Sequence, residues 1–323
     1  SQFISDSLLR YPNPEQLIVV LVGHGSGWGA NVMSGQPNPH IWPQPSGWGD
    51  QNGGMLWDDT PDNGTDASLS LSTAALGETM RLAGAQIGRP VDLLYLDACD
   101  MALAEVAYEV RGSVSHLLAS PNVAWASFNF DNLLPDVTEG RTGAEIGDLW
   151  LESEAEFLNE HPGHPYTFSL IDLDKMNAVA TAATGLADEL LADMAASRPH
   201  IIDAHAASGK YDSNFDGKLD VNDSYTDLLD FAEHLQNNDA ANTGVRTAAE
   251  EVVASVDEVV TKTAFSSGTP WPYPNDEWYW ERYGGLGIYL PTARDEARRK
   301  AYYNAAYLAW AADTTWDEFL DVF

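Results

Sequence analysis

Apolar runs alternate with amphipathic stretches along this chain. Residues 17–22 form a continuous apolar and mostly β-branched run, which is typical of a strand buried on both faces. Further strands are expected at 91–96 and 117–120, and helices at 72–82, 142–159, 176–196, 243–263 and 294–312. Strands that alternate with helices are typical of a parallel sheet with helices on both faces, so the sequence predicts an α/β fold.

Two of the predicted strands lead to side chains that can do chemistry. Residues 17–22 run directly into the glycine-flanked His24, and residues 91–96 lead to Cys99, the only cysteine of the chain. The carboxyl ends of neighbouring parallel strands meet at the crevice where open α/β sheets place their active sites. An imidazole there can take the proton of a thiol and later protonate a leaving amine. The pair predicts a cysteine hydrolase, although a lone cysteine is more often a small buried apolar residue.

The motifs at these strand ends resemble those of the clostripain-like cysteine peptidases, relatives of caspases, legumain and gingipains. The chain reads His-Gly-Ser-Gly-Trp over residues 24–28 and Asp-Ala-Cys-Asp-Met over residues 97–101. Further similar segments lie at 105–109, 118–120, 168–173, 225–231 and 285–291. The resemblance covers nearly the whole chain in order. It implies a caspase-like three-layer α/β/α fold with a mainly parallel central sheet and additional C-terminal helices.

The resemblance also implies a role for each residue of the motifs. His24 would be the general base or acid and Cys99 the nucleophile, with backbone amides near Gly25 and Cys99 forming the oxyanion hole. Asp97 would line the pocket for the residue before the scissile bond, where a carboxylate favours Arg or Lys. The alternative is that Asp97 is a solvated or helix-capping acid.

One departure from the family pattern concerns this specificity pocket. Family members that cleave after a basic residue usually carry a further acid in the loop after the Ala-Ser element. Here that loop, residues 121–131, holds no charged residue before Asp131. Ser120 and Asp131 are therefore the other expected substrate-binding residues, and the specificity is relaxed if Asp131 does not reach the pocket.

A second motif lies at residues 212–223. Oxygen-bearing side chains at positions one, three, five and twelve, a glycine at six and an apolar residue at eight match a calcium loop of the EF-hand and dockerin type. The alternative is an acidic turn without a metal. We expect a structural Ca²⁺ that orders residues 225–231 and does not touch the chemistry. Its expected ligands are Asp212, Asn214, Asp216, the Lys218 carbonyl, Asp220 directly or through water, and Asp223. The acidic cluster at 58–62 is a further candidate cation site, although such clusters are more often solvated loops.

The charge composition limits the classes of partner that the protein is expected to bind. The chain has 16 Lys and Arg against 49 Asp and Glu, a formal net charge of −33. Such a field repels nucleic acid and anionic membrane surfaces and attracts cationic substrates and divalent ions. We therefore expect a peptide or protein substrate and neither a nucleic-acid nor a membrane partner. One cysteine excludes an internal disulfide, no charged-then-apolar leader opens the chain, and the calcium loop favours a secreted mature protein.

The expected organisation has three parts. Residues 1–200 would form the catalytic core, residues 205–236 a calcium-loop insertion, and residues 237–323 a helical part that completes the same peptidase unit. The sequence thus predicts a calcium-binding cysteine endopeptidase that cleaves after Arg or Lys through a Cys-His dyad. The alternative from another class is a catalytically silent, calcium-dependent binding module on the same fold. The intact His24, Asp97 and Cys99 favour the enzyme.

Overall fold

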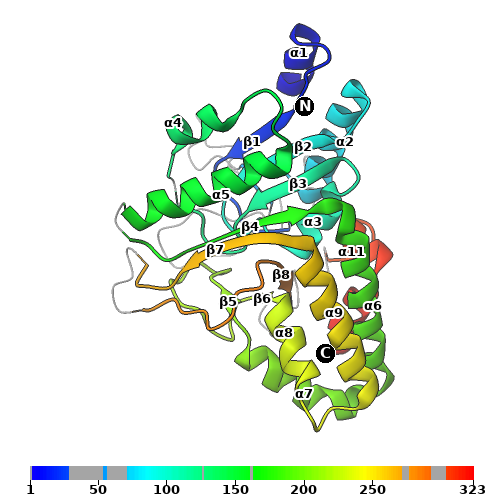
Figure 1. Cartoon of the computed structure of the whole chain (residues 1–323). Coiled ribbons are helices and arrows are strands. Elements are labelled where there is room, and N and C mark those ends of the chain that lie inside the picture. The colour runs from blue at the N-terminus through cyan, green and yellow to red at the C-terminus, as the bar shows by residue number, and fades with distance from the viewer. Residues whose placement is uncertain are drawn as a thin grey trace, which may run out of the picture.

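The computed structural model describes residues 2–28, 54–56, 71–125, 127–160, 163–270, 276–291 and 303–323 (Figure 1). Its main sheet has five strands, in the spatial order β1 (Ile18–Val22), β2 (Val91–Asp97), β3 (Val114–Ala119), β4 (Tyr166–Asp172) and β7 (Val260–Ser266). Strands β1, β2 and β3 pair in parallel, and β4 pairs antiparallel with both β3 and β7. All strands except β4 therefore share one direction, and the mainly parallel sheet is confirmed.

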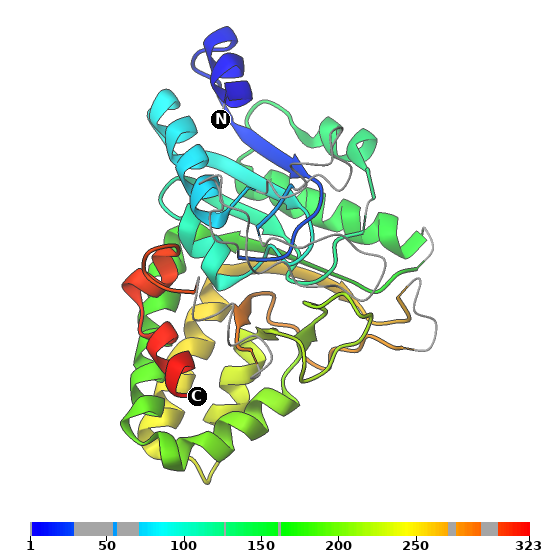
Figure 2. The same cartoon turned by 180° about the vertical axis from the view of Figure 1, so that it is seen from behind.

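Helices cover both faces of this sheet (Figures 1 and 2). One face carries α4 (Phe130–Leu133), the short helix η1 (Leu134–Asp136) and α5 (Gly143–Glu160). The other carries α2 (Thr73–Ile87) and α3 (Ala104–Val110), with η2 (Leu173–Lys175), α6 (Met176–Ala192) and α9 (Thr243–Val259) continuing that layer. The architecture is a three-layer α/β/α arrangement.

Strand β2 divides its side chains between the two cores. Leu94 and Leu96 join the larger core, which includes α2, α3 and α6, whereas Leu93 and Tyr95 join the smaller core under α5. This alternation follows from the two-residue period of a strand. Because β2 is apolar on both sides, it is held in the middle of the fold, and its carboxyl end has a fixed position.

A smaller sheet flanks the main one. It consists of β5 (Lys210–Tyr211), β6 (Tyr225–Asp227) and β8 (Gly287–Tyr289), and the 212–223 loop connects its first two strands. Because β6 pairs with β8, residues 205–236 share a sheet with the last part of the chain. The remaining helices are α1 (Gln2–Arg10), α7 (Met194–Ala207), α8 (Leu228–Gln236), α11 (Ala309–Asp313) and α12 (Trp316–Val322). Among the described residues, no helix is long and apolar enough to cross a membrane.

Four predicted helices have different bounds in the structure, and the one expected at 72–82 continues to Ile87. The helix expected at 243–263 ends at Val259, because the next seven residues alternate half-buried and exposed side chains, which is the period of an edge strand. The helix expected at 176–196 ends at Ala192, and Asp193 then caps α7 by accepting a hydrogen bond from Ala196 N. Of the helix expected at 294–312, residues up to 302 lie outside the described part, and the described remainder becomes helical only at Ala309.

Candidate active site

The ends of β1 and β2 bring His24 and Cys99 to the same edge of the main sheet. Val22 lies opposite Asp97 in the parallel register, and Gly23 N donates a hydrogen bond to Asp97 O at 3.1 Å. Gly25 then packs directly on the turn after β2. A Cβ atom at Gly25 would collide with the Cys99 carbonyl oxygen and lie 2.9 Å from the Cys99 nitrogen. Only glycine permits this approach, so the turn that carries His24 is seated against the backbone of Cys99.

A second segment supports the histidine turn from the other side. Leu56 N donates to His24 O at 2.8 Å, and Ser26 N donates to Gly54 O at 3.0 Å. Gly25 lies opposite Met55 in this antiparallel pairing, in the position where neither residue bonds to the other. The N–H of Gly25 therefore points away from Met55. The side chain of His24 is exposed.

The sulfur of Cys99 is covered by a loop. Ala124 N donates to Cys99 Sγ at 3.4 Å, and Sγ lies 3.7 Å from the carbonyl oxygen of Ala124. The Cys99 residue as a whole is half-buried, but its thiol is enclosed under this backbone. Burial, with a smaller contribution from the negative charge of Asp100, raises the pKa of the Cys99 thiol to about 12. In this conformation the thiol is protonated and shielded.

The loop over Cys99 is anchored by aromatic contacts. Trp125 donates from Nε1 to Pro165 O at 2.6 Å and stacks on His164 with ring centroids 4.3 Å apart. It also stacks on Trp278 at 6.0 Å. Because Trp125 follows Ala124 directly, these contacts hold the cover in place over the sulfur.

Two buried carboxylates lie beside the nucleophile on the α5 side. Asp97 is 6% exposed and Glu154, from α5, is 1% exposed. Burial raises the pKa of Asp97 to about 6. Burial, with the nearby Asp97 charge as a smaller cause, raises the pKa of Glu154 to about 7. The hydroxyls of Ser127 and Tyr95 lie beside the Glu154 carboxylate and favour its charged form, which offsets part of the effect of burial.

The other expected substrate-binding residues lie elsewhere. Asp131 is exposed on α4, whereas Asp97 is buried at the end of β2, so Asp131 does not supply the second acid of this pocket in the structure. Ser120 is fully buried. Its hydroxyl lies 2.9 Å from Thr167 Oγ1 and hydrogen-bonds the backbone of Asn122, which makes it a support for the loop over Cys99.

Glu154 was not predicted from the sequence, yet a signal was present. The buried residues of α5 recur at helical spacing, and Glu154 occupies one of these positions among Trp150, Leu151 and Leu158. A carboxylate on the apolar face of an amphipathic helix is rarely fully buried unless it is paired. Once the period of the helix is drawn, this position stands out as a candidate functional residue.

The 212–223 loop has the turn geometry expected of its motif. Gly217, at position six, has φ +82°, and its N–H donates to Asp212 Oδ2 at 3.0 Å. Ser213 N donates to Asp223 Oδ1 at 2.9 Å and Asp220 N donates to Asp223 Oδ2 at 2.9 Å, so the last acid closes the loop on its beginning. Burial raises the pKa of Asp212 to about 7 and that of Asp223 to about 8.

The expected calcium ligands differ in exposure. Asp212 and Asp223 are buried, whereas Asp216 and Lys218 are exposed, and Asn214 and Asp220 are intermediate. Within the described ranges, no three His, Cys, Asp or Glu side chains are already gathered closely enough to hold a metal ion. The candidate cation site at 58–62 lies outside the described residues.

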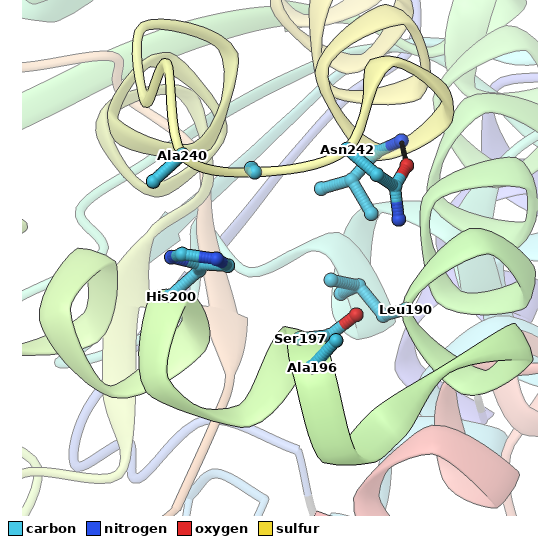
Figure 3. A pocket seen from close by; sticks show the side chains of 8 residues that line it. Leu190, Ala196, Ser197, His200, Ala240 and Asn242 are labelled. Atoms are coloured by element: carbon cyan, nitrogen blue, oxygen red, sulfur yellow. Dashed lines mark hydrogen bonds between the residues drawn. The ribbon is translucent and has the colours of Figure 1, made fainter.

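A pocket in the helical part of the molecule contains none of these residues. It is lined by Leu190 of α6, by Ser197 and His200 of α7, and by Asn242 at the start of α9 (Figure 3). The Asn242 side chain caps α9 by accepting from Val245 N at 2.8 Å. This pocket is separate from the edge of the sheet that carries His24 and Cys99.

The family model of the clostripain family matches residues 1–323. The chain belongs to the clostripain family. Clostripain of Hathewaya histolytica is 23% identical over 343 residues, which cover 95% of this chain and 59% of that protein. The chain thus spans 59% of the length of this curated relative.

Solved structures share the fold of this family member. A secreted C11 cysteine protease from Bacteroides thetaiotaomicron has a TM-score of 0.61 at 14% identity, with 97% of this chain and 75% of that chain covered. An inactive zymogen C11 protease from Parabacteroides distasonis has a TM-score of 0.56 at 19% identity, with 97% and 74% covered. The expected caspase-like three-layer fold, with its C-terminal helices, is therefore confirmed.

Proposed function

We propose that this protein is a cysteine endopeptidase in which Cys99 is the nucleophile and His24 the general base and acid. The observation that carries the proposal is the close packing of Gly25 on the Cys99 backbone, which keeps the histidine turn beside the nucleophile. Family membership supports the reaction class. The fold alone would not, because one fold hosts many functions.

The reaction follows from these groups. His24 takes the thiol proton of Cys99 as the sulfur attacks the scissile carbonyl carbon, and the C=O electron pair moves onto the oxygen. When the tetrahedral intermediate collapses, the C–N bond breaks and His24 protonates the leaving amine, which leaves a thioester on Cys99. Water then attacks the thioester, with His24 accepting its proton and returning a proton to the thiolate. The products are a carboxylic acid and the free enzyme.

Gly25 and Cys99 supply the oxyanion hole in this proposal. The Gly25 N–H points away from Met55 in the antiparallel pairing, and Gly25 packs on the backbone of Cys99, so this amide lies beside the turn that begins at Cys99. Two amides aimed at the developing oxyanion are worth most in the transition state, where losing one typically costs about 3 kcal/mol.

The cover over the sulfur has to move before attack. The backbone N–H and carbonyl oxygen of Ala124 both lie against Sγ, where a substrate carbonyl would have to approach. Displacement of residues 121–125 would hydrate the thiol and reduce the desolvation that raises its pKa. We infer that substrate binding displaces this loop and completes the site.

We further propose that Asp97 and Glu154 together select Arg or Lys before the scissile bond. Both acids are buried, and neither forms an ion pair with a cationic side chain of the described residues. A guanidinium or ammonium group entering beside them would compensate two carboxylates that the fold leaves without a positive partner. Glu154 thus takes the place that the sequence assigned to Asp131.

We propose that the 212–223 loop binds Ca²⁺ through the six residues expected from its motif. The residues fit the ion, because the fold buries the Asp212 and Asp223 carboxylates without an ion pair to a cation of the described chain. Bound calcium would supply positive charge and fix the loop, and it takes no part in peptide hydrolysis. A secreted location remains a prediction from the sequence.

Covalent labelling tests the catalytic assignment. A peptide with Arg next to an alkylating group should add one label to Cys99, located by mass spectrometry, and stop turnover. His24→Ala should slow both labelling and turnover by at least about 100-fold, the usual contribution of a general base. Label on another residue, or turnover by Cys99→Ala, would overturn the assignment. Specific peptide binding by the wild type without turnover would favour the silent binding module.

A further inference from the structure

Asp100, the residue after Cys99, is an unusual place for a carboxylate. It is 0% exposed, and neither Oδ1 nor Oδ2 has a hydrogen-bond partner among the described residues. Its backbone has φ +60°. Burying a charged group without a partner is strongly unfavourable, so this carboxylate needs either a proton or a cation.

The turn at Asp100 is connected to the first residue of the 212–223 loop. Asp100 N donates to the backbone carbonyl of Asn122 at 3.0 Å, and the side-chain Oδ1 of Asn122 accepts from Asp212 N at 2.8 Å. Asn122 therefore bridges the two segments. The negative charges that act on Asp100 are those of Asp212 and Asp223, the first and last acids of the calcium motif.

These three buried carboxylates act on one another electrostatically and have little compensating positive charge. The cation close to Asp223 is Lys210, whose ammonium group donates to the backbone carbonyls of His205 and Ser208. No ion pair joins it to Asp100, Asp212 or Asp223 within the described ranges. A small, hard cation, which takes 6–8 oxygen ligands, would compensate these carboxylates if they closed around it.

The last position of the loop carries a shorter acid than is usual for its motif. Loops of the EF-hand type usually end on a glutamate that binds the ion through both oxygens, whereas this motif ends on the shorter Asp223. A shorter acid at position twelve reaches less far toward the ion. An oxygen from outside the loop could complete the coordination, and Asp100 is a buried carboxylate without another partner.

We propose that Asp100 is a further ligand of the calcium ion held by the 212–223 loop. The proposal rests on the calcium site proposed above. It makes one ion a bridge between that loop and the turn directly after the nucleophile. Calcium is then more than a distant structural element, because its binding fixes the backbone that follows Cys99.

A second contact reinforces this bridge. Trp278 Nε1 donates to Gly217 O, in the middle of the calcium loop, at 2.9 Å. Trp278 also stacks on Trp125, next to the residue that covers the Cys99 sulfur. The cover and the calcium loop therefore touch through Asn122 at one point and through Trp278 at another. Since linkage is reciprocal, occupation of the Cys99 site by a peptide changes calcium affinity as much as calcium changes peptide affinity.

Calorimetry with a matched set of variants tests the proposal. All variants carry Cys99→Ala, so that no self-cleavage occurs, and calcium is titrated into the chelator-treated protein. Asp100→Asn tolerates the left-handed backbone and removes only the charge. We expect it to weaken calcium binding on the order of tenfold or more, because calcium affinity follows the charge count of the ligands. The control Asp131→Asn removes an equal charge from an exposed position and should leave the affinity unchanged.

Melting temperatures distinguish a ligand role of Asp100 from a purely structural role, because the two roles predict opposite changes in the absence of calcium. Without calcium, Asp100→Asn should melt at the same or a higher temperature than the parent, because an uncompensated buried carboxylate is gone. With calcium, the gain in melting temperature should be smaller than that of the parent. A purely structural role of Asp100 would instead lower the melting temperature in both conditions.

The outcomes are distinguishable. Parental affinity in Asp100→Asn overturns the ligand role of Asp100 and leaves the calcium loop standing. A parent that binds no calcium overturns the calcium site itself, and Asp216→Ala, which should bind weakly, checks that any measured heat belongs to the loop. If Asp100→Asn does not fold, Asp100→Gly replaces it, because glycine adopts φ +60° without strain.

Discussion

Two acidic clusters flank the nucleophile, and they differ in how their carboxylates are held. On the α5 side, Asp97 and Glu154 have few hydrogen-bond donors, the Ser127 side chain being one, and they lie against an apolar core. On the other side, Asp212 and Asp223 each accept backbone N–H groups from a tight loop, and Asp100 lies beside them. The first cluster offers charge to a long side chain that enters from outside. The second holds its carboxylates by hydrogen bonds from the backbone of a tight loop.

The comparison shows that burial of acidic side chains does not by itself determine which cation a cluster binds. A preorganised ring of backbone donors orients oxygens toward one point, as calcium requires. A pair of buried acids beside a displaceable loop can instead accommodate a flexible cation with several donors, as guanidinium has. The two clusters should therefore respond to different perturbations.

Removing the charge of Asp97 should have the largest effect. Asp97→Asn should lower kcat/KM for substrates with Arg before the scissile bond on the order of 100-fold, because a desolvated charge pair is lost. Cleavage of substrates with a neutral residue there should change little. Calcium affinity should also stay as it is, since Asp97 belongs to the other cluster. Equal loss for both substrate types would show that Asp97 supports the fold and not the specificity.

Removing calcium should lower the stability of the folded protein, which is the next effect in size. At a calcium concentration about 100 times Kd, binding stabilises the folded chain by about 2.7 kcal/mol, so chelation should lower the melting temperature by several degrees. Asp216→Ala should make the melting temperature insensitive to added calcium. The preference for Arg over neutral residues should persist in the activity that remains. A wild-type melting curve that chelator does not move would contradict the site.

The burial of Glu154 should appear in the pH dependence of the stability of the protein. Its pKa rises from 4.5 to about 7 on folding, so its contribution to stability is complete below pH 4.5 and is lost as the pH rises through 7. Glu154→Gln should therefore unfold at the same denaturant concentration as the wild type at pH 4, and be more stable at pH 8 by as much as about 3 kcal/mol. The variant should also lose about tenfold in kcat/KM for Arg substrates, as expected for one charged hydrogen bond. Unchanged stability at pH 8 would remove Glu154 from the pocket.

The smallest effect concerns self-cleavage. Residues 25–80 contain neither Lys nor Arg, so an enzyme specific for basic residues has no cutting site in this long stretch before the nucleophile. We expect the active enzyme to remain uncut there. Mass spectrometry of active protein decides the point, and a break within 25–80 that Cys99→Ala does not show would contradict the basic specificity.

The sequence predicted the features that depend on neighbours in the chain. The apolar runs before His24 and Cys99 predict buried strands, and the glycine at position six of residues 212–223 predicts the tight turn found at Gly217. Strand β7 was missed because its first residues continue the helical pattern of α9, and only the pairing with β4 makes it a strand. The bounds of helices were therefore less certain than their existence.

The missing parts of the site depend on contacts between distant segments. The place of Glu154 beside Asp97 requires the packing of α5 on β2. The link between Asp100 and Asp212 runs through Asn122, and Asp212 lies far along the chain. The loop over Cys99 is likewise held by the hydrogen bond from Trp125 to Pro165, which directly precedes β4. No local pattern announces these contacts.

Cleavage profiling tests the central claim most directly. A diverse peptide mixture is incubated with the wild-type protein and with Cys99→Ala, both with calcium, and the new termini are identified by mass spectrometry. The account predicts cuts after Arg and Lys with the wild type and none with the variant, because Cys99 carries the attack and Asp97 and Glu154 select the cation. Cuts that persist in the variant, or wild-type cuts with no preference for a basic residue, would contradict it.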